Sequence, residues 1–141
     1  TQMLEIGPGD RVFELGTGSG YQAAVLAEMG IEVYSMEIVE PLGKAAAARL
    51  KRRGYAVTTR VGDGYYGWEQ HAPFDGIIVT AAASQIPPPL IRQLKPGGVM
   101  VIPVGAPFAV QQLVLVKKDE KGLISTRGVL AVRFVPVTRG H

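Results

Sequence analysis

A group of glycines next to an acidic residue is the stretch of this sequence best suited to bind a ligand. Glu14 stands two residues before the first of three alternating glycines, and an alanine-rich helical pattern follows over residues 22–28. A strand that runs into such glycines and then into a helix is typical of a ligand-binding loop, because glycine lets the backbone approach the ligand closely. The predicted ligand contacts in this loop are Gly16, Thr17, Gly18, Ser19 and Gly20.

The acid and the glycine spacing together indicate which ligand the loop holds. The fingerprint of dinucleotide-binding proteins places its third glycine one position later, where this chain has Tyr21. Glu14 would also repel a pyrophosphate bound at the start of the helix. S-adenosylmethionine carries a sulfonium, an ammonium and an adenosine but no phosphate, so it tolerates a nearby carboxylate. We therefore expect S-adenosylmethionine as the cofactor, with Glu14 at its site, and keep a nicotinamide-dependent dehydrogenase as a distant alternative.

A second acidic residue, Glu37, ends the next apolar run, 17 residues after Gly20. A carboxylate at this place can accept hydrogen bonds from both ribose hydroxyls of a nucleoside. We predict that Glu37 and its neighbour Ile38 bind the cofactor. Pro41 follows shortly afterwards, so a charge that stabilises the start of a helix is the alternative role for Glu37.

Two further apolar runs end in small or acidic residues. Asp63 could accept a hydrogen bond from the adenine amino group while the Gly64 amide meets a ring nitrogen, and an ordinary turn aspartate is the alternative. Thr80 and Ala81, also predicted to lie at the cofactor, open a loop of small residues with room for an anionic acceptor. A carboxylate is ionised at neutral pH, so methyl transfer to it requires no general base.

Aromatic residues near the glycine turns could either stack on the ligand or anchor the packing. The four candidates are Tyr21, Tyr65, Tyr66 and Trp68, and packing anchors are the more common role at such positions. We expect His71 to cap or pack locally.

Alternating helix and strand patterns must position these residues. Strands are expected at 12–15, 31–37, 55–61, 74–80 and 99–104, with helices at 20–29, 40–51 and 90–94 between them. A helix end is expected at 1–6, a turn at 95–98, and helix-free strands at 113–116 and 129–137. This order predicts an α/β fold with a doubly wound, mainly parallel sheet and an antiparallel C-terminal edge, in a single domain over residues 1–141.

Composition narrows the function classes. The 141 residues include no cysteine and two histidines, so disulfides are excluded and we expect no metal site. The net charge of +3 is thinly spread, and its only cluster, 51–53, suits the end of a helix better than a nucleic-acid surface. No apolar run is long enough to span a membrane and no leader opens the chain. We expect a cytoplasmic monomer with no nucleic-acid or membrane partner.

Over most of its length the chain resembles the protein-L-isoaspartate (D-aspartate) O-methyltransferases. The motifs that carry the resemblance are Gly-Thr-Gly-Ser-Gly-Tyr-Gln at 16–22, Gly-Asp-Gly-Tyr at 62–65, Val-Thr-Ala-Ala at 79–82, Leu-Lys-Pro-Gly-Gly at 94–98, Ile-Pro-Val-Gly at 102–105 and Val-Arg-Phe-Val-Pro at 132–136. The first and third of these motifs together are specific to that family, whereas the glycine loop alone indicates only a methyltransferase. The resemblance implies the Rossmann-like fold of class I S-adenosylmethionine-dependent methyltransferases.

The resemblance also implies an activity and a substrate. Enzymes of this family transfer a methyl group from S-adenosylmethionine to the free carboxylate of L-isoaspartyl residues in damaged proteins, which starts their repair. Family members carry an upstream serine-containing segment that helps to bind the isoaspartyl group, and nothing before Thr1 corresponds to it. We therefore expect an incomplete acceptor site and assign no catalytic residue. A methyltransferase with a different carboxylate acceptor and a binding-only fragment are the alternatives.

Overall fold

The computed structural model describes residues 6–16, 20–81, 83–106 and 110–132. Its strands are β1 (Arg11–Leu15), β2 (Glu32–Glu37), β3 (Val57–Val61), β4 (Phe74–Val79), β5 (Leu94–Val104), β6 (Gln111–Lys118) and β7 (Ile124–Val132). Its helices are α1 (Tyr21–Glu28), α2 (Glu40–Arg52) and α3 (Pro88–Gln93), with short 3-10 helices η2 (Gly64–Tyr66) and η3 (Glu69–His71). The expected end of a helix at the N-terminus falls largely outside the described residues.

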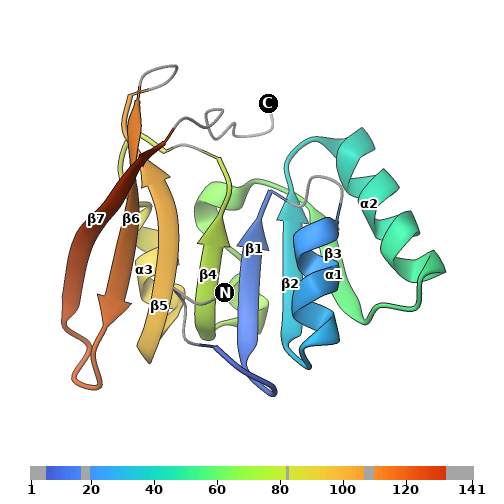
Figure 1. The fold of residues 1–141 in the computed structure, drawn as a ribbon, viewed down its shortest axis with the longest axis horizontal. Helices are drawn as coiled ribbons and strands as arrows, with labels where there is room; N and C mark the ends of the chain where they lie inside the picture. The colour runs from blue at the N-terminus through green and yellow to red at the C-terminus, as the bar shows by residue number, and fades with distance from the viewer. Residues whose placement is uncertain (1–5, 17–19, 82, 107–109, 133–141) are drawn as a thin grey trace.

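The described strands form one seven-stranded sheet in the order β3-β2-β1-β4-β5-β6-β7. The pairs from β3 to β5 are parallel, and β6 and β7 add two antiparallel pairs at one edge. Figure 1 shows the arrowheads of β1, β2, β4 and β5 at the same edge, which is uppermost in that view. The predicted doubly wound sheet with an antiparallel C-terminal edge is therefore confirmed.

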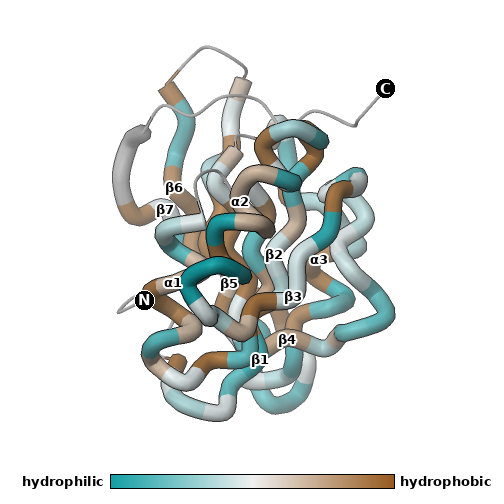
Figure 2. The backbone as a smooth tube through the Cα atoms, turned by 90° about the vertical axis from the view of Figure 1, so that its right-hand side faces the viewer, coloured by the Kyte–Doolittle hydropathy of each residue, from teal (hydrophilic) through white to brown (hydrophobic). Residues whose placement is uncertain are grey.

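Two hydrophobic layers cover the faces of the sheet. On one face, Ala23 and Leu26 of α1 and Leu50 of α2 pack against the strands. On the other face, Leu90 of α3 joins the layer in which the rings of Phe13 and Phe74 stack with centroids 5.3 Å apart. The middle of β1 (Val12 and Phe13) and the end of β4 (residues 77–79) are apolar and buried, because both faces of these central strands are covered. Figure 2 shows the hydrophobic stretches running through the middle of the molecule, where the strands lie.

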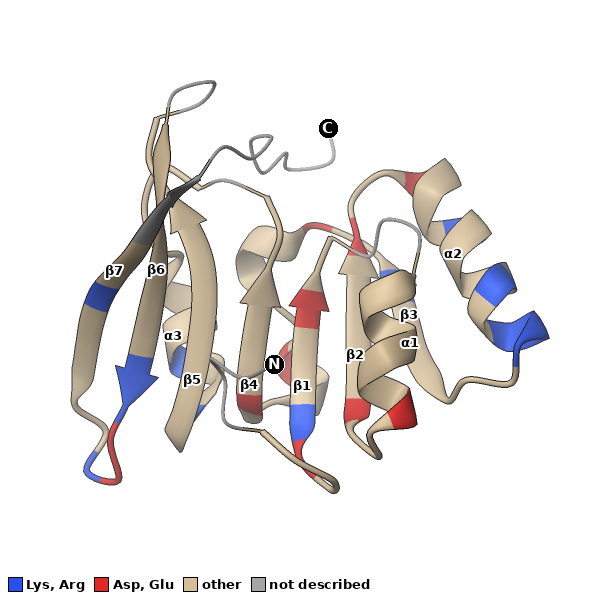
Figure 3. Cartoon of the chain, viewed as in Figure 1, with Lys and Arg blue, Asp and Glu red and all other residues tan. Residues whose placement is uncertain are grey.

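The sequence at both ends of helix α2 is typical of helix termini. Glu40 lies in its first turn, basic residues lie in its last turn, and Gly54 follows its end at φ 78°. Acids at the start and cations at the end complement the helix dipole, and a glycine with positive φ is the usual residue after the last turn. Figure 3 shows the resulting basic cluster at the end of α2, where the sequence predicted a helix end.

Strands β5 and β7 begin several residues earlier than the sequence indicates. The expected turn at 95–98 lies inside β5, which starts at Leu94, directly after α3. Leu94 pairs with Phe74 and Val99 pairs with Gly76, so the additional residues of β5 form a bulge in the ladder. Strand β7 begins at 124 and not at 129, since Asp119 Oδ1 closes a tight turn by accepting hydrogen bonds from two backbone amides. Residues 133–137 of that expected strand lie outside the described part.

The other differences concern element ends and one segment. The third strand starts at 57 and not at 55, and α3 starts at Pro88, because proline is well suited to the first turn of a helix. The segment between β3 and β4 contains two short 3-10 helices, η2 and η3. Among the described residues, no helix has the length and apolar character needed to cross a bilayer.

Candidate cofactor site

The edge of the sheet at the carboxyl ends of β1 and β4, called the crevice below, is the place where this sheet can bind a ligand. From β1 the chain continues outward through β2 to β3, whereas β4 and β5 lie on the other side of β1. In open α/β sheets, ligands bind outside the carboxyl ends of the strands at the point where the strand order reverses. The loops after β1 and β4 therefore carry the site, and those after β2 and β3 flank it.

The loop after β1 is held close to the loop after β4. Gly16 has φ 97°, and a Cβ on it would lie 2.1 Å from Oγ1 of Thr80, so only glycine fits at this position. The Thr80 hydroxyl lies 3.0 Å from the carbonyl oxygen of Leu15 and 3.1 Å from that of Gly16, and it donates its proton to this pair. Thr80 thus fixes the spacing of the two loops across the crevice.

Gly20 ends the glycine loop and precedes α1. Its φ is 87°, and a Cβ on it would come within 3.3 Å of Leu50 on α2. The predicted contacts Thr17, Gly18 and Ser19, together with Ala82 after β4, lie outside the described residues. Ala81 is half-buried beside Thr80.

Glu14 is the most unusual side chain at the crevice. It is completely buried, the Ser35 hydroxyl donates a hydrogen bond of 2.5 Å to Oε1, and Oε2 has no partner among the described residues. The pKa of this carboxyl is raised from an ordinary 4.5 to about 7, mainly by burial; the hydrogen bond from Ser35 acts to lower it, and the charge of Glu37 acts to raise it. The sequence predicted an ionised carboxylate here. In the structure, burial raises the pKa of this carboxyl, so that both the protonated and the ionised forms are populated near neutral pH.

Glu37 lies at the end of β2 and is 7% exposed. Its Oε2 accepts hydrogen bonds from the backbone amides of Ile38 at 2.9 Å and Val39 at 3.1 Å, just before α2 begins. This arrangement matches the alternative role at a helix start and still keeps the carboxylate at the edge of the crevice. Figure 3 shows acidic residues at the upper ends of both β1 and β2. Gly43 supports this position, because a Cβ on it would lie 3.3 Å from the Glu37 Cβ.

Asp63 and Gly64 follow β3 and begin the segment that contains η2. Asp63 Oδ1 accepts a hydrogen bond of 3.0 Å from the Tyr65 amide, which is the behaviour of a turn aspartate. Gly64 is buried, and a Cβ on it would lie 2.0 Å from Cδ1 of Leu15 at the end of β1. The glycine at position 64 thus allows the third loop to pack directly against the central strand.

The candidate aromatic residues divide between exposed and buried positions. Trp68 is buried in the core, with its ring edge-on to Tyr34 at a centroid distance of 5.8 Å. Tyr21 is 76% exposed and Tyr66 is 59% exposed, so neither anchors the packing. The His71 ring packs locally, edge-on to Trp68 with centroids 4.9 Å apart, and it also stacks on the distant Tyr34 of β2 at 4.3 Å.

Sequence reasoning missed three residues that support the site. Ser35 donates a hydrogen bond to the buried Glu14, and the only hint of this in the sequence was its polar side chain within the second predicted strand. Gly43 had no signal, because its close neighbours come from β2 and β3. Gln93 is buried at the end of α3 and binds the segment after β3, far away in the sequence.

The donors and acceptors at the crevice fit a cationic nucleoside better than a phosphate. An unpartnered carboxyl oxygen is buried beside a glycine loop, and two further acids end or follow β2 and β3. A buried acceptor without a partner is costly, and a cation or an N–H donor would satisfy it. Among the described residues, no group of three or more potential ligating side chains could hold a metal ion.

The fold and the arrangement of loops define a class I S-adenosylmethionine-dependent methyltransferase fold. The sequence matches the family described as Protein-L-isoaspartate(D-aspartate) O-methyltransferase (PCMT) over residues 1–141, and the chain belongs to this family. It is 63% identical to protein-L-isoaspartate O-methyltransferase 2 of Syntrophobacter fumaroxidans, over 100% of this chain and 58% of that protein. The chain thus spans little more than half the length of this curated relative.

Solved structures agree with this assignment. A protein-L-isoaspartate O-methyltransferase superposes with a TM-score of 0.90 at 30% identity, over 99% of this chain and 45% of that chain. A putative protein-L-isoaspartate O-methyltransferase from Plasmodium falciparum, solved in complex with S-adenosyl-L-homocysteine, has a TM-score of 0.76 at 26% identity, over 94% of this chain and 67% of that chain.

Proposed function

We propose that this protein transfers a methyl group from S-adenosylmethionine to the free carboxylate of L-isoaspartyl residues in damaged proteins. The observation that carries the proposal is the buried Glu14 carboxyl with its unpartnered oxygen, set beside the glycine loop at the reversal of strand order. Membership of the isoaspartyl methyltransferase family supports the choice of substrate.

Each acid at the crevice has a part in the proposed cofactor site. Glu14 offers its unpartnered oxygen to the ammonium group of the cofactor. Glu37 accepts from the ribose hydroxyls, and Ile38 lines the same end of the site. Asp63 accepts from the adenine amino group while the Gly64 amide donates to a ring nitrogen. The glycine loop, from Gly16 through Thr17, Gly18 and Ser19 to Gly20, approaches the cofactor with its backbone.

The reaction requires the protein mainly to position the cofactor and the acceptor carboxylate. When bound, the cofactor supplies an electrophilic methyl group. The acceptor carboxylate is already ionised at neutral pH, so no residue needs to remove a proton. Thr80 and Ala81 keep the acceptor side of the crevice narrow but free of bulky side chains, and rate enhancement rests on holding the carboxylate oxygen in line with the methyl group.

Calorimetry with S-adenosylhomocysteine and a methyl-transfer assay on an isoaspartyl peptide test the proposal together. The control peptide has the same sequence with a normal aspartate. Binding together with methylation of the isoaspartyl peptide alone is the expected result. Binding without turnover would support a binding-only fragment, and turnover on another carboxylate would replace the substrate. Tight NADH binding without affinity for S-adenosylhomocysteine would remove the assignment.

We further propose that the 141 residues act as one domain and that the protein is a cytoplasmic monomer without nucleic-acid or membrane partners. The continuous seven-stranded sheet supports a single cooperative unit. A single unfolding transition, a monomeric mass in sedimentation and recovery in the cytoplasmic fraction are the expected results. Retention on a nucleic-acid column at physiological salt would contradict the last part.

A further inference from the structure

Gln93, the last residue of α3, is buried under the segment that joins β3 to β4. The residue is 8% exposed. Nε2 donates a hydrogen bond of 2.8 Å to the carbonyl oxygen of Tyr66, and Oε1 accepts one of 2.9 Å from the amide of Trp68. The amide group therefore binds the backbone on both sides of Gly67.

The two partners determine the orientation of the Gln93 amide. A backbone N–H can only donate and a carbonyl oxygen can only accept, so Oε1 must face Trp68 and Nε2 must face Tyr66. Gly67 has φ 67°, and a Cβ on it would lie 2.2 Å from Gln93 Oε1. The backbone of this segment thus closes tightly around one side chain, and the shape of the turn depends on that side chain.

The clamped turn is connected directly to the proposed adenine contacts. The amide of Gly67 donates a hydrogen bond of 3.1 Å to the carbonyl oxygen of Gly64, and Asp63 caps the same short helix, η2. Gly64 in turn packs against Leu15 at the end of β1. A shift of the turn would therefore move Asp63 and Gly64 relative to β1, where the cofactor is proposed to lie.

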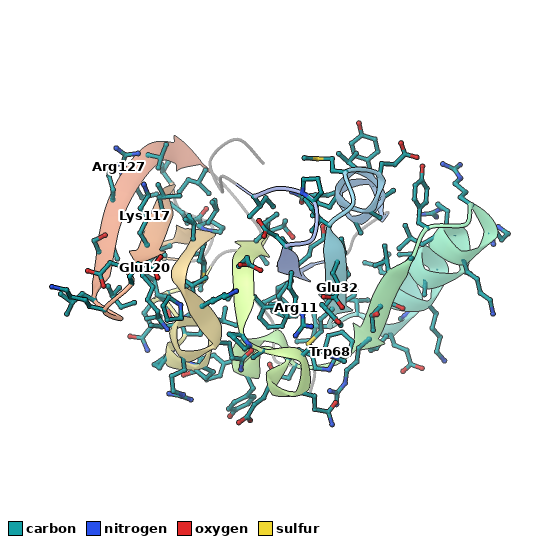
Figure 4. The ribbon with its side chains drawn as sticks, turned by 90° about the horizontal axis from the view of Figure 1, so that it is seen from below. Arg11, Glu32, Trp68, Lys117, Glu120 and Arg127 are labelled. Atoms are coloured by element: carbon teal, nitrogen blue, oxygen red, sulfur yellow. The ribbon has the colours of Figure 1, made fainter. Side chains whose placement is uncertain are left out.

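The far end of the segment is fixed independently of Gln93. Nη1 of Arg11 donates a hydrogen bond of 2.9 Å to the carbonyl oxygen of His71, and Nε of the same residue pairs with Glu32 at 3.0 Å. Figure 4, seen from the edge opposite the crevice, shows Arg11, Glu32 and Trp68 near one another. Loss of the Gln93 amide would thus loosen the part of the segment next to Asp63 while the part near β4 stays attached.

We propose that Gln93 is a positioning residue for adenine recognition: through the turn at 66–68 it holds Asp63 and Gly64 where they meet the base. The inference rests on the proposed cofactor site and adds to it a residue on the opposite side of the segment. Hydrophobic packing does not require an amide here, since leucine or methionine would fill a similar volume. The specific contribution of the amide is its pair of hydrogen bonds to the turn.

The test compares two ligands that differ only at the base. S-adenosylhomocysteine has the adenine amino group, and S-inosylhomocysteine has an oxo group in its place. The variants are Gln93→Leu, which removes both hydrogen bonds, and Gln93→Glu, which restores a donor to Tyr66 only when its carboxyl is protonated. Val116→Ala, in the core at β6, is the control for general destabilisation. Calorimetry gives the affinities, and urea unfolding shows that each variant is folded.

In Gln93→Leu we expect the preference for S-adenosylhomocysteine over the inosine analogue to fall about tenfold, as for a lost hydrogen bond to the base. Val116→Ala should keep the wild-type preference. Gln93→Glu should recover preference relative to wild type as the pH is lowered from 8 to 6. An unchanged preference in Gln93→Leu, with the wild type binding S-adenosylhomocysteine, would overturn the inference. Failure of the wild type itself to bind that ligand would instead overturn the proposed function.

Discussion

The buried Glu14 carboxyl should make the free energy of unfolding depend on pH, and replacing Glu14 by glutamine should remove that dependence. The side chain is completely buried, and its pKa is raised from an ordinary 4.5 to about 7, mainly by burial. The folded protein therefore binds the proton more tightly than the unfolded chain does. Stability is greatest below the unfolded pKa, declines as the pH rises from 4.5 to about 7, and changes no further from this group above that range.

The size of the effect follows from the same two values. Between pH 5 and pH 8 the free energy of unfolding should fall by about 2.5 kcal/mol because of Glu14 alone. A glutamine is neutral at every pH and has nearly the same shape. Any fixed effect of its amide on packing is the same at both pH values, so it cancels when the two are compared.

Urea unfolding of wild type and Glu14→Gln at pH 5 and pH 8 measures this difference. The variant should gain about 2.5 kcal/mol relative to wild type on going from the lower to the higher pH. Glu28→Gln, at an exposed position on α1, is the matched control and should show no such gain. If Glu14→Gln and wild type respond equally to pH, Glu14 is not held protonated by burial and the account of the crevice is wrong.

The same carboxyl links cofactor binding to protons. A cation placed beside Oε2 would lower the pKa of Glu14, so binding of S-adenosylhomocysteine at pH 7 should release about half a proton. Calorimetry in buffers with different ionisation enthalpies measures that number. In Glu14→Gln the release should vanish and the affinity should fall, whereas equal proton release in both proteins would show that the ligand does not meet this side chain.

Two further predictions use matched pairs of positions. Glu37→Ala should weaken S-adenosylhomocysteine binding by roughly 1.5–3 kcal/mol, as for lost hydrogen bonds to a charged group. Glu40→Ala, which removes an exposed ion pair with Lys44 and the acid in the first turn of α2, should leave the calorimetric affinity unchanged. Equal losses of affinity in the two variants would show that Glu37 acts only as a charge at the start of the helix. Gly67→Ala should lower the free energy of unfolding by roughly 3 kcal/mol, because its Cβ would meet Gln93. Gly54→Ala, also at positive φ but with open space around it, should cost about 1 kcal/mol in the same urea experiment.

The order of helices and strands could be predicted because the buried strands correspond to apolar runs in the sequence and the helices lie between turn-forming residues. The strands around Phe13 and Ile77 are examples, since both of their faces are covered. The start of β5 at Leu94 could not be predicted, because it depends on pairing with Phe74 and on Lys118, whose ammonium donates to the carbonyl oxygens of Ile91 and Leu94. These contacts join distant parts of the chain.

The location of the candidate site could be predicted more fully than its internal contacts. Glu14, Glu37 and Asp63 were recognisable because each ends or follows an apolar run, and parallel strands bring such ends to one edge. Local sequence could not show that Ser35 donates to Glu14, or that Gln93 clamps the segment after β3. Those contacts depend on the register of β1 against β2 and on the packing of α3, which only the assembled fold defines.

The close contact between Gly64 and Leu15 should couple the substitutions that the two positions can accept. A methyl group on residue 64 would occupy the space that the leucine side chain fills. A lineage could therefore replace this glycine only after residue 15 had become smaller, and the reverse order would pass through an overpacked intermediate. Substitutions at positions 15 and 64 should therefore occur as pairs, with the change at position 15 coming first.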